Sequence, residues 1–265
     1  MSEFRCLVKK DIKEILRTGK LILFVVLGLG IAVMILAFTA LFTDLPDFLE
    51  VELPGIDIVS LENMMGTLYP RMVRESLGIF AYYIGIFYSL IIILVSHAVL
   101  PNERKNGKWV LPVQQGYTKR TIVTSKCLVY GTLAAASVFV SYLFYYAAAE
   151  TFMMRNMPFG NAFFLAVIHG LNLFFILCFT MLLSVYFKSS VVAVISVLGT
   201  VLFVPDIMNY LPVGIYLPTY MLTFVYESGS DFGLVVGPLL MSIFLLILTY
   251  YIVVIKLEKE SSSAL

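Results

Sequence analysis

The sequence predicts an all-α integral membrane protein with six transmembrane helices in a single domain, residues 1–265. Of its residues 60% are hydrophobic and only 13% are charged, whereas soluble domains carry about 25% charged residues. The mean hydropathy is +0.95. Six apolar runs contain no Asp, Glu, Lys or Arg. A water-soluble core cannot absorb this composition, so the runs are expected to cross a membrane.

Five of the runs are long enough to cross unaided, because a hydrocarbon core of about 30 Å needs roughly 20 helical residues. The sixth run, Val191–Val204, spans only about 21 Å at about 1.5 Å per residue. Ser189 and Ser190 before it and Asp206–Met208 after it must extend it. The predicted spans are 21–43, 76–100, 127–149, 162–187, 189–207 and 234–255.

The basic residues predict the orientation. With a cytoplasmic N-terminus, 15 of the 18 Lys and Arg residues lie inside, and only Arg71, Arg74 and Arg155 lie outside. Basic residues concentrate on the cytoplasmic side of membrane proteins. Both termini are therefore expected inside, and the expected location is a bacterial plasma (inner) membrane.

The segment before the first span predicts an amphipathic helix within residues 1–20. Its apolar and basic residues occupy different faces, which describes a helix lying in the membrane interface. The basic face would meet lipid headgroups or a partner, although an ordinary juxtamembrane anchor has the same pattern. The apolar residues are Phe4, Leu7, Val8, Ile12, Ile15 and Leu16, and the other face carries Lys9, Lys10, Lys13, Glu14 and Arg17.

Two segments are expected outside. Residues 44–75 are acidic, are broken by Pro46, Pro54, Gly55 and Pro70, and predict a small cap of one or two short helices. Pro205–Phe232 leads into the last span through the external segment 208–233 and is rich in Pro, Gly and Tyr yet apolar. It predicts short re-entrant helices sheltered by protein, with a plain exposed loop as the alternative.

The chain shows no catalytic motif and is not expected to be an enzyme. It has no phosphate-binding loop, nucleophile elbow or His-Glu-x-x-His pair, and Cys6, Cys127 and Cys178 lack metal spacing. His169 is expected to bond between helices. The spans also lack the ionisable residues that carry coupling charge in ion-driven transporters. The protein is therefore passive, or another protein drives it.

The segment 101–126 between the second and third spans is basic and carries the chain's single tryptophan, Trp109. Its order is Glu103-Arg104-Lys105-Asn106-Gly107, an apolar turn Leu111-Pro112-Val113, then Gly116-Tyr117-Thr118-Lys119-Arg120 and Lys126 heading the next span. Motif and layout together resemble the first cytoplasmic loop of type-2 ATP-binding-cassette (ABC) export permeases. Trp109 and Gln114-Gln115 depart from the family's more usual Leu, Glu or Ser.

The resemblance implies a permease subunit that binds two copies of an ABC ATPase and pairs with a second permease copy, as a homodimer or with a paralogue. It implies no cofactor on this chain, because the ATPase binds ATP and Mg²⁺, and no nucleic acid. Asn102–Pro112 would be the coupling helix. Trp109 would be its apolar anchor, or else a membrane-interface anchor. The implied ATPase contacts are Glu103, Arg104, Lys105, Gly107 and Trp109, flanked by Lys9 and Lys10.

The same resemblance places a substrate path near the second and fifth spans, and its apolar surfaces suit an amphipathic or hydrophobic cargo. A small peptide such as a toxin or bacteriocin is the preferred cargo. Lipid or drug export and a non-transporting sensor or immunity subunit are the alternatives, since a lipid-modifying enzyme would need a polar cluster. The path residues are Phe80, Tyr83, Phe87, Val194, Val197, Leu198 and Val201.

Overall fold

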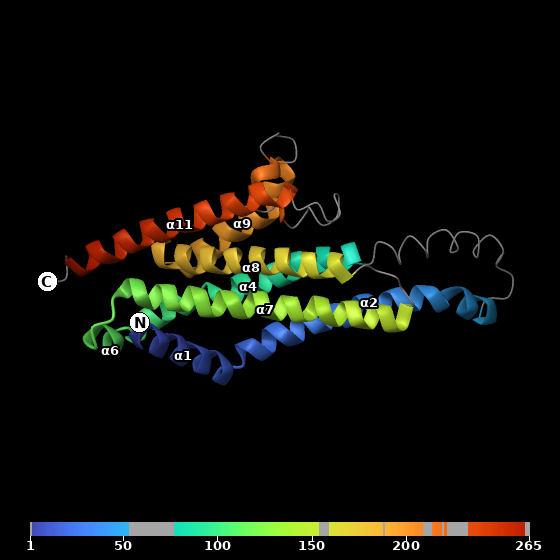
Figure 1. Cartoon of the computed structure of the whole chain (residues 1–265), viewed down its shortest axis with the longest axis horizontal. Coiled ribbons are helices and arrows are strands. Elements are labelled where there is room, and N and C mark those ends of the chain that lie inside the picture. The colour runs from blue at the N-terminus through green and yellow to red at the C-terminus, as the bar shows by residue number, and fades with distance from the viewer. Residues whose placement is uncertain are drawn as a thin grey trace.

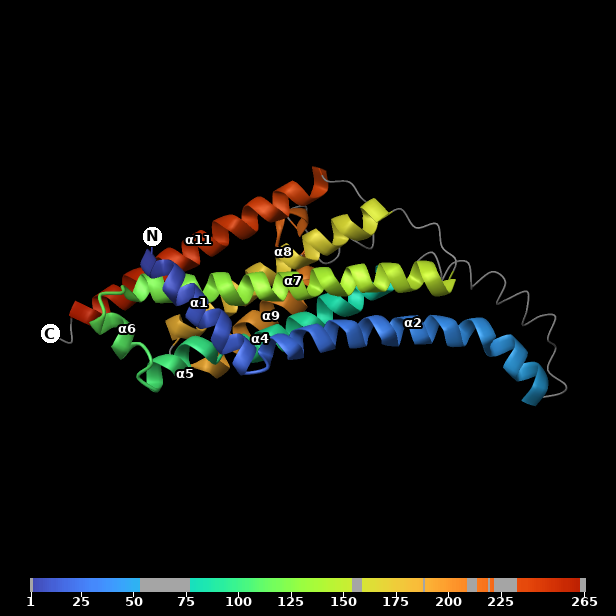
Figure 2. The same cartoon turned by 60° about the horizontal axis from the view of Figure 1, so that its bottom comes forward.

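The computed structural model describes residues 2–52, 77–153, 159–187, 189–208, 214–218, 220–221 and 233–262, and all regular structure in these ranges is helical. The helices form an elongated bundle (Figure 1). The N-terminus, α6 and the C-terminal part of α11 lie at one end of it, here called the loop end (Figure 2). Six long or medium helices make up most of the bundle. They are α1 (Ser2–Arg17), α2 (Lys20–Glu52), α7 (Lys119–Met153), α8 (Phe159–Phe187), α9 (Ser190–Met208) and α11 (Gly233–Ser262).

Shorter helical pieces connect these elements. Between α2 and α7 the chain is helical over residues 77–83, and then forms a π-helical turn and three short helices. A single 3₁₀ turn precedes α11. In order these are η1 (Ile84–Tyr88), α4 (Ser89–Ser96), α5 (Val99–Lys105), α6 (Val110–Gln114) and η2 (Gly214–Tyr216).

Five helices are long and apolar enough to cross a membrane, which confirms the prediction of an all-helical, multi-pass membrane protein. The corresponding stretch of α9, Val191–Val201, is shorter. A sixth span, the sidedness of the termini and the interfacial position of α1 stay predictions. The five are Lys20–Ala40, Leu77–Lys105, Lys119–Thr151, Phe159–Phe187 and Gly233–Lys259.

The core lies between α7, α8, α2 and the second span, and aromatic rings fill much of it. Phe80 stacks on Tyr145 at 4.2 Å between ring centroids and meets Tyr142 edge-on at 4.9 Å. The backbones of α2 and α7 approach closely at Gly28, where a Cβ atom would meet the Ser141 hydroxyl. Small residues allow such close approach between membrane helices, so the bundle is tightly packed here.

Two helices extend beyond the predicted spans. α2 does not break at Pro46 but continues to Glu52. The third span's helix does not begin after Lys126 but at Lys119, because Thr118 caps it: the Thr118 hydroxyl accepts a hydrogen bond from the Thr121 amide at 3.1 Å. This is a typical N-cap interaction, and it places Lys126 two turns inside the helix.

The described part of the segment before α11 packs back onto the bundle. Tyr216 lies against Gly237 so closely that a Cβ atom there would meet its ring at 2.8 Å. Met221 is buried beside Ile168 of α8 and Val235 of α11. The rest of the predicted re-entrant segment lies outside the described residues, as do residues 53–76 with Arg71 and Arg74, and also Arg155 and Lys188.

Candidate functional site: a buried lysine that joins α1, α5 and α7

The loop between the second and third spans is a sequence of helices separated by tight glycine turns. α5 ends at Gly107, whose φ of 68° is in the left-handed region. The Lys108 amide donates to the Glu103 carbonyl at 2.9 Å and the Gly107 amide to Arg104 at 3.2 Å. These two bonds form a Schellman motif, which favours glycine at this position. Gly107 therefore forms the tight turn that ends α5.

The same motif ends α6. Gly116 has a φ of 92°. The Tyr117 amide donates to the Pro112 carbonyl at 3.1 Å and the Gly116 amide to Val113 at 3.0 Å. Because both ends of the one-turn helix α6 are fixed by backbone hydrogen bonds, its side chains keep a defined direction relative to α5 and α7.

The loop presents an apolar surface bordered by basic residues. Val110, Leu111 and Val113 are exposed, with Leu111 at 64%. The neighbouring Trp109 is 6% exposed and packs into the core of the bundle. Large apolar side chains in a charged loop indicate a surface for a membrane or a protein partner. The basic border consists of Arg104, Lys105 and Lys108.

Beneath this loop lies Lys126, a fully buried cation that three carboxylates surround. Its Nζ atom lies 2.9 Å from Asp11 Oδ1, 2.9 Å from Glu14 Oε2 and 2.6 Å from Glu103 Oε1. Asp11 and Glu14 belong to α1, Glu103 to α5, and Lys126 to α7. We call Lys126 with these three carboxylates the lysine cluster. It joins α1 to α5 and α7, which lie far from α1 in the sequence (Figure 2).

Because Lys126 and Asp11 are buried, each of their charges needs a partner. Each residue is at most 2% exposed, and an unpaired charge at such a depth is very costly. The second oxygen of Asp11 is satisfied as well, since the Ser125 hydroxyl donates to Oδ2 at 2.5 Å. The ion pairs therefore hold α1 against α7 in one arrangement.

Glu14 extends the cluster toward the surface. Lys108, next to the Gly107 turn, bonds Glu14 Oε1 at 2.9 Å while Lys126 bonds Oε2. Burial alone would raise the pKa of the Glu14 carboxyl, but the hydrogen bonds and charges of Lys126 and Lys108 outweigh it and lower the pKa from 4.5 to about 2. Glu14 therefore stays ionised over the physiological range.

The start of α2 also lies beside the lysine cluster, where Lys20 contacts Tyr130 of α7. The Lys20 ammonium donates to the Tyr130 hydroxyl at 3.4 Å. It lies 5.2 Å from the centre of the ring, and Lys126 lies 5.7 Å from it. Both distances are within the range of cation–π attraction. The region around the lysine cluster thus collects contacts from α1, α2, α5 and α7.

The residues predicted to contact an ATPase fall into two groups. Glu103 and Trp109 are buried inside the chain, where Glu103 contacts Lys126. Arg104, Lys105 and Gly107 lie on the exposed turn. Contact with a partner stays a prediction for all of them.

Lys9 and Lys10, the flanking residues, are exposed on α1. Lys9 borders an open groove between α1 and Leu128 of α7. The buried stripe of α1 differs from the predicted apolar face, because Asp11 lies on it between Leu7 and Ile15 while Leu16 is 55% exposed.

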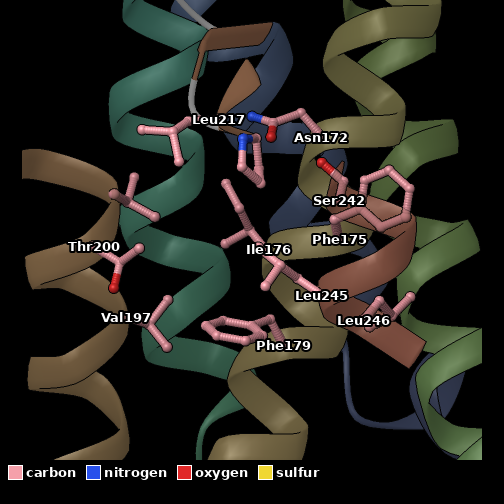
Figure 3. Close-up of a pocket in the computed structure, with 12 residues that line it drawn as sticks. Asn172, Phe175, Ile176, Phe179, Val197, Thr200, Leu217, Ser242, Leu245 and Leu246 are labelled. Atoms are coloured by element: carbon pink, nitrogen blue, oxygen red, sulfur yellow. The ribbon is translucent and has the colours of Figure 1, made fainter. Parts of the chain in front are cut away.

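The residues predicted to line a substrate path differ in their exposure and surroundings. Phe80 belongs to the core, whereas Tyr83 stacks with Phe87 at 5.8 Å and Phe87 is 44% exposed. Val197 and Val201 of α9 instead line a cavity with α8 and α11 (Figure 3). Val194 and Leu198 are half-buried against the core. The substrate path therefore stays a prediction.

Two further observations concern His169 and possible metal ligands. The hydrogen bond expected for His169 is confirmed, since its Nδ1 lies 2.9 Å from the Tyr142 hydroxyl of α7. Within the described ranges no group of three or more His, Cys, Asp or Glu side chains could hold a metal ion. A lysine, not a cation from solution, occupies the centre of the carboxylate cluster.

The lysine cluster was missed by the sequence reasoning, although two signals for it exist. Asp11 and Glu14 are three residues apart among the basic residues of α1, and such a pair shares one face. Lys126 is the last charge before the apolar part of α7. Reading the two together would have suggested an ion pair between α1 and α7, but nothing local identifies Glu103 as the third carboxylate.

Comparison with known proteins identifies no relative: no protein-family model, curated protein or solved structure matches the chain. The function must therefore be argued from the loop, the lysine cluster and the helix arrangement.

Proposed function

We propose that this chain is the membrane subunit of an ATP-driven exporter of the type-2 ABC class, with the loop 101–126 as its contact to a separate ATPase. The observation that carries the proposal is the lysine cluster, which fastens this loop to α7 and α1. ATP and Mg²⁺ would bind to the partner, since the chain contains no phosphate-binding loop. Two ATPase copies and a second permease copy complete the proposed assembly.

The connections of the loop support a role in transmitting force. α5 continues the second span, and α7 is the third span. Glu103 of α5 pairs with Lys126 of α7 at 2.6 Å, so the two spans are bound together just below the loop. A push on α6 would then move both helices as a unit. Rigid-body movement of this kind suits conformational switching, because packed helices have discrete arrangements.

The exposed surface of the loop suits a protein groove. Leu111, Val110 and Val113 offer apolar contacts, and Arg104 and Lys105 stand beside them on the α5 turn. Interfaces commonly combine a few apolar anchors with Arg contacts at their edge. Because Trp109 is buried, we assign the anchor role in the ATPase contact to Leu111 and its apolar neighbours. Lys9 and Lys10 would lie at the edge of this contact.

The cargo proposed is an amphipathic or hydrophobic molecule, with a small peptide preferred. The lipid-side surfaces of the described spans and the cavity beside α9 are apolar. They offer no charged group that would bind a sugar or an ion. Export toward the outside follows from the proposed family and from the orientation that the basic residues predict.

The test is a pull-down in detergent with each ABC ATPase subunit encoded in the genome that carries this chain. The double variant Val110→Ser, Leu111→Ser removes exposed side chains and leaves the lysine cluster intact. We expect it to reduce ATPase recovery at least tenfold. The matched control is Leu234→Ser. Leu234 lies at the N-terminal end of α11, away from the loop end, and is also exposed, at 40%. This variant should leave recovery unchanged.

Two results would contradict the proposal. If folded wild-type chain captures no ATPase, the energy source disappears and a passive or sensor role becomes preferable. If the loop variant binds the ATPase as well as the wild type does, the contact lies elsewhere. Chromatographic monodispersity of each variant shows that the fold has survived the substitutions.

A further inference from the structure

A cavity of about 120 Å³ lies among α8, α9, α11 and the segment that follows η2. Figure 3 shows its wall: Asn172, Ile176 and Phe179 come from α8, Thr200 from α9, Leu245 from α11, and Leu217 closes the end beside Asn172. An engineered cavity of about 150 Å³ is large enough for benzene. The space therefore fits one bulky apolar group and no more.

The lining is apolar except for one amide. The hydroxyl groups in the wall are already bonded within their own helices, Thr200 to the Ser196 carbonyl and Ser242 to the Pro238 carbonyl, each at 2.8 Å. Asn172 is 1% exposed, and its Nδ2 has no hydrogen-bond partner among the described residues. A buried donor without a partner is rare and costly. A ligand in the cavity that carries an acceptor would satisfy this donor.

The depth of Asn172 narrows the identity of that acceptor. The residue lies 13 positions after Phe159 and 15 before Phe187, the ends of α8, which places it about 20 Å and about 22 Å from the helix ends. Asn172 is thus near the middle of this span. The ester carbonyls of phospholipids lie about 15 Å from the midplane, at the border of the hydrocarbon core. A lipid tail at this depth has no acceptor to offer, whereas a peptide has a carbonyl at every residue.

We infer that the cavity binds one bulky aliphatic or aromatic side chain of a hydrophobic peptide, whose backbone carbonyl accepts a hydrogen bond from Asn172 Nδ2. This inference rests on the proposed function, because it specifies the cargo of the exporter. Val197 and Val201 form the α9 wall, so the site lies within one chain, between α8, α9 and α11. The volume of the cavity selects the size of one peptide side chain, and Asn172 binds the peptide backbone.

The test uses the purified chain in lipid nanodiscs without an ATPase. The probe is the N-acetylated, C-amidated heptapeptide Leu-Ala-Leu-photoleucine-Leu-Ala-Leu, cross-linked by light and located by mass spectrometry. Attachment is expected on cavity residues of α8 and α11, such as Phe175 and Leu246. Asn172→Leu keeps the size of the side chain and removes the donor. It should lower labelling about three- to tenfold, the range that corresponds to one hydrogen bond between membrane segments.

A second variant tests the space itself. Val201→Phe fills the cavity from α9 and should abolish most of the labelling. Its matched control, Val192→Phe, makes the same change on the same helix at a position that is 44% exposed and outside the cavity. The control should label like the wild type. Equal labelling of wild type, Asn172→Leu and Val201→Phe, or labelling confined to other helices, would overturn the inference.

A competing probe separates peptides from lipids. A short-chain benzoquinone with a diazirine carries carbonyl oxygens on an apolar ring and would represent an isoprenoid ligand. If it labels the cavity residues and the peptide does not, the site takes a lipid and the peptide inference fails. Because binding is measured without the ATPase, these outcomes are independent of the pull-down. Loss of the cavity site would leave the proposed exporter standing, and loss of ATPase binding would leave the site standing.

Discussion

The lysine cluster and the Asn172 cavity handle buried polar groups in opposite ways. At the loop end, every charged group of the cluster has a partner, with three carboxylates around one ammonium. Midway along α8, the Asn172 amide faces an apolar cavity without a partner among the described residues. Full pairing fixes one arrangement of the helices, whereas an unpaired donor beside empty space leaves an interaction to be made.

The two regions therefore differ in how freely their helices can rearrange. At the loop end the helices have few alternative arrangements, because separating α1, α5 and α7 would expose Lys126 without its counter-charges. The region around α9 and α11 contains space and a free donor. A membrane protein driven from one end needs a stiff connection there and a part that can accept a ligand further along. Three variants test this difference between the two regions.

The largest effect is expected for Lys126→Met, which leaves Asp11 and Glu103 buried without their cation. Loss of one member of a buried ion pair destabilises a protein by about 3 to 5 kcal/mol. We expect a corresponding fall in the unfolding free energy in detergent, with α1 the first element to become accessible to protease. Chemical denaturation and limited trypsin digestion at Arg17 measure the two effects.

The control for this variant is Lys105→Met, which removes an exposed lysine from the same loop and should change stability by less than about 0.5 kcal/mol. Adding Asp11→Asn to Lys126→Met should recover part of the loss, because one uncompensated charge disappears. A Lys126→Met protein as stable as the wild type would mean that the cluster does not hold the loop end together.

An intermediate effect of opposite sign is expected for Asn172→Leu. Burying an amide donor without a partner costs about 1 to 3 kcal/mol, so a leucine of similar size should stabilise the empty protein by about 1 kcal/mol. Thr200→Val is the matched control, since the Thr200 hydroxyl is already bonded to Ser196. It should be neutral or slightly destabilising. Destabilisation by Asn172→Leu would show that the amide is satisfied in the native protein.

The smallest effect concerns Glu14 and pH. Its pKa is about 2 in the fold and 4.5 ordinarily, so its contribution to docking α1 is complete above about pH 4.5. It declines as the pH falls toward 2. Since Glu14 is partly exposed, the effect should be below about 1 kcal/mol.

A polarity-sensitive dye on the exposed Cys6, in a background with Cys127→Ser, should report release of α1 in this acid window. The Glu14→Gln variant should lose that part of the profile. If both proteins show the same curve between pH 4.5 and 2, Glu14 does not contribute to the docking of α1.

The helical spans could be predicted from the sequence because length and hydrophobicity are local properties of each run. Helix ends were harder to predict. The start of α7 depends on the hydroxyl of Thr118, and reading the span from Cys127 onward considered only the apolar residues. Likewise Pro46 did not end α2, because a proline near the C-terminal end of a long helix can be accommodated at the cost of one hydrogen bond.

The candidate sites could be predicted only in part. Gly107 and the hydrogen bond of His169 follow from residue type and local context. Glu103 and Trp109 were expected to face a partner, but the sequence does not say which face of the loop turns inward. That choice depends on Lys126, and on Asp11 in α1, which precedes Glu103 and Trp109 by more than 90 residues. The cavity beside α9 depends on how three helices pack, which no local pattern encodes.

The burial of Trp109 has an optical consequence. The chain has one tryptophan, and it lies at the loop end, 6% exposed, next to the exposed residues of α6. Indole emission shifts with the polarity around the ring, so the tryptophan fluorescence of the protein reports on this one place. Selective excitation of the indole, at wavelengths where the 16 tyrosines do not absorb, would follow events at the loop in real time with no dye attached.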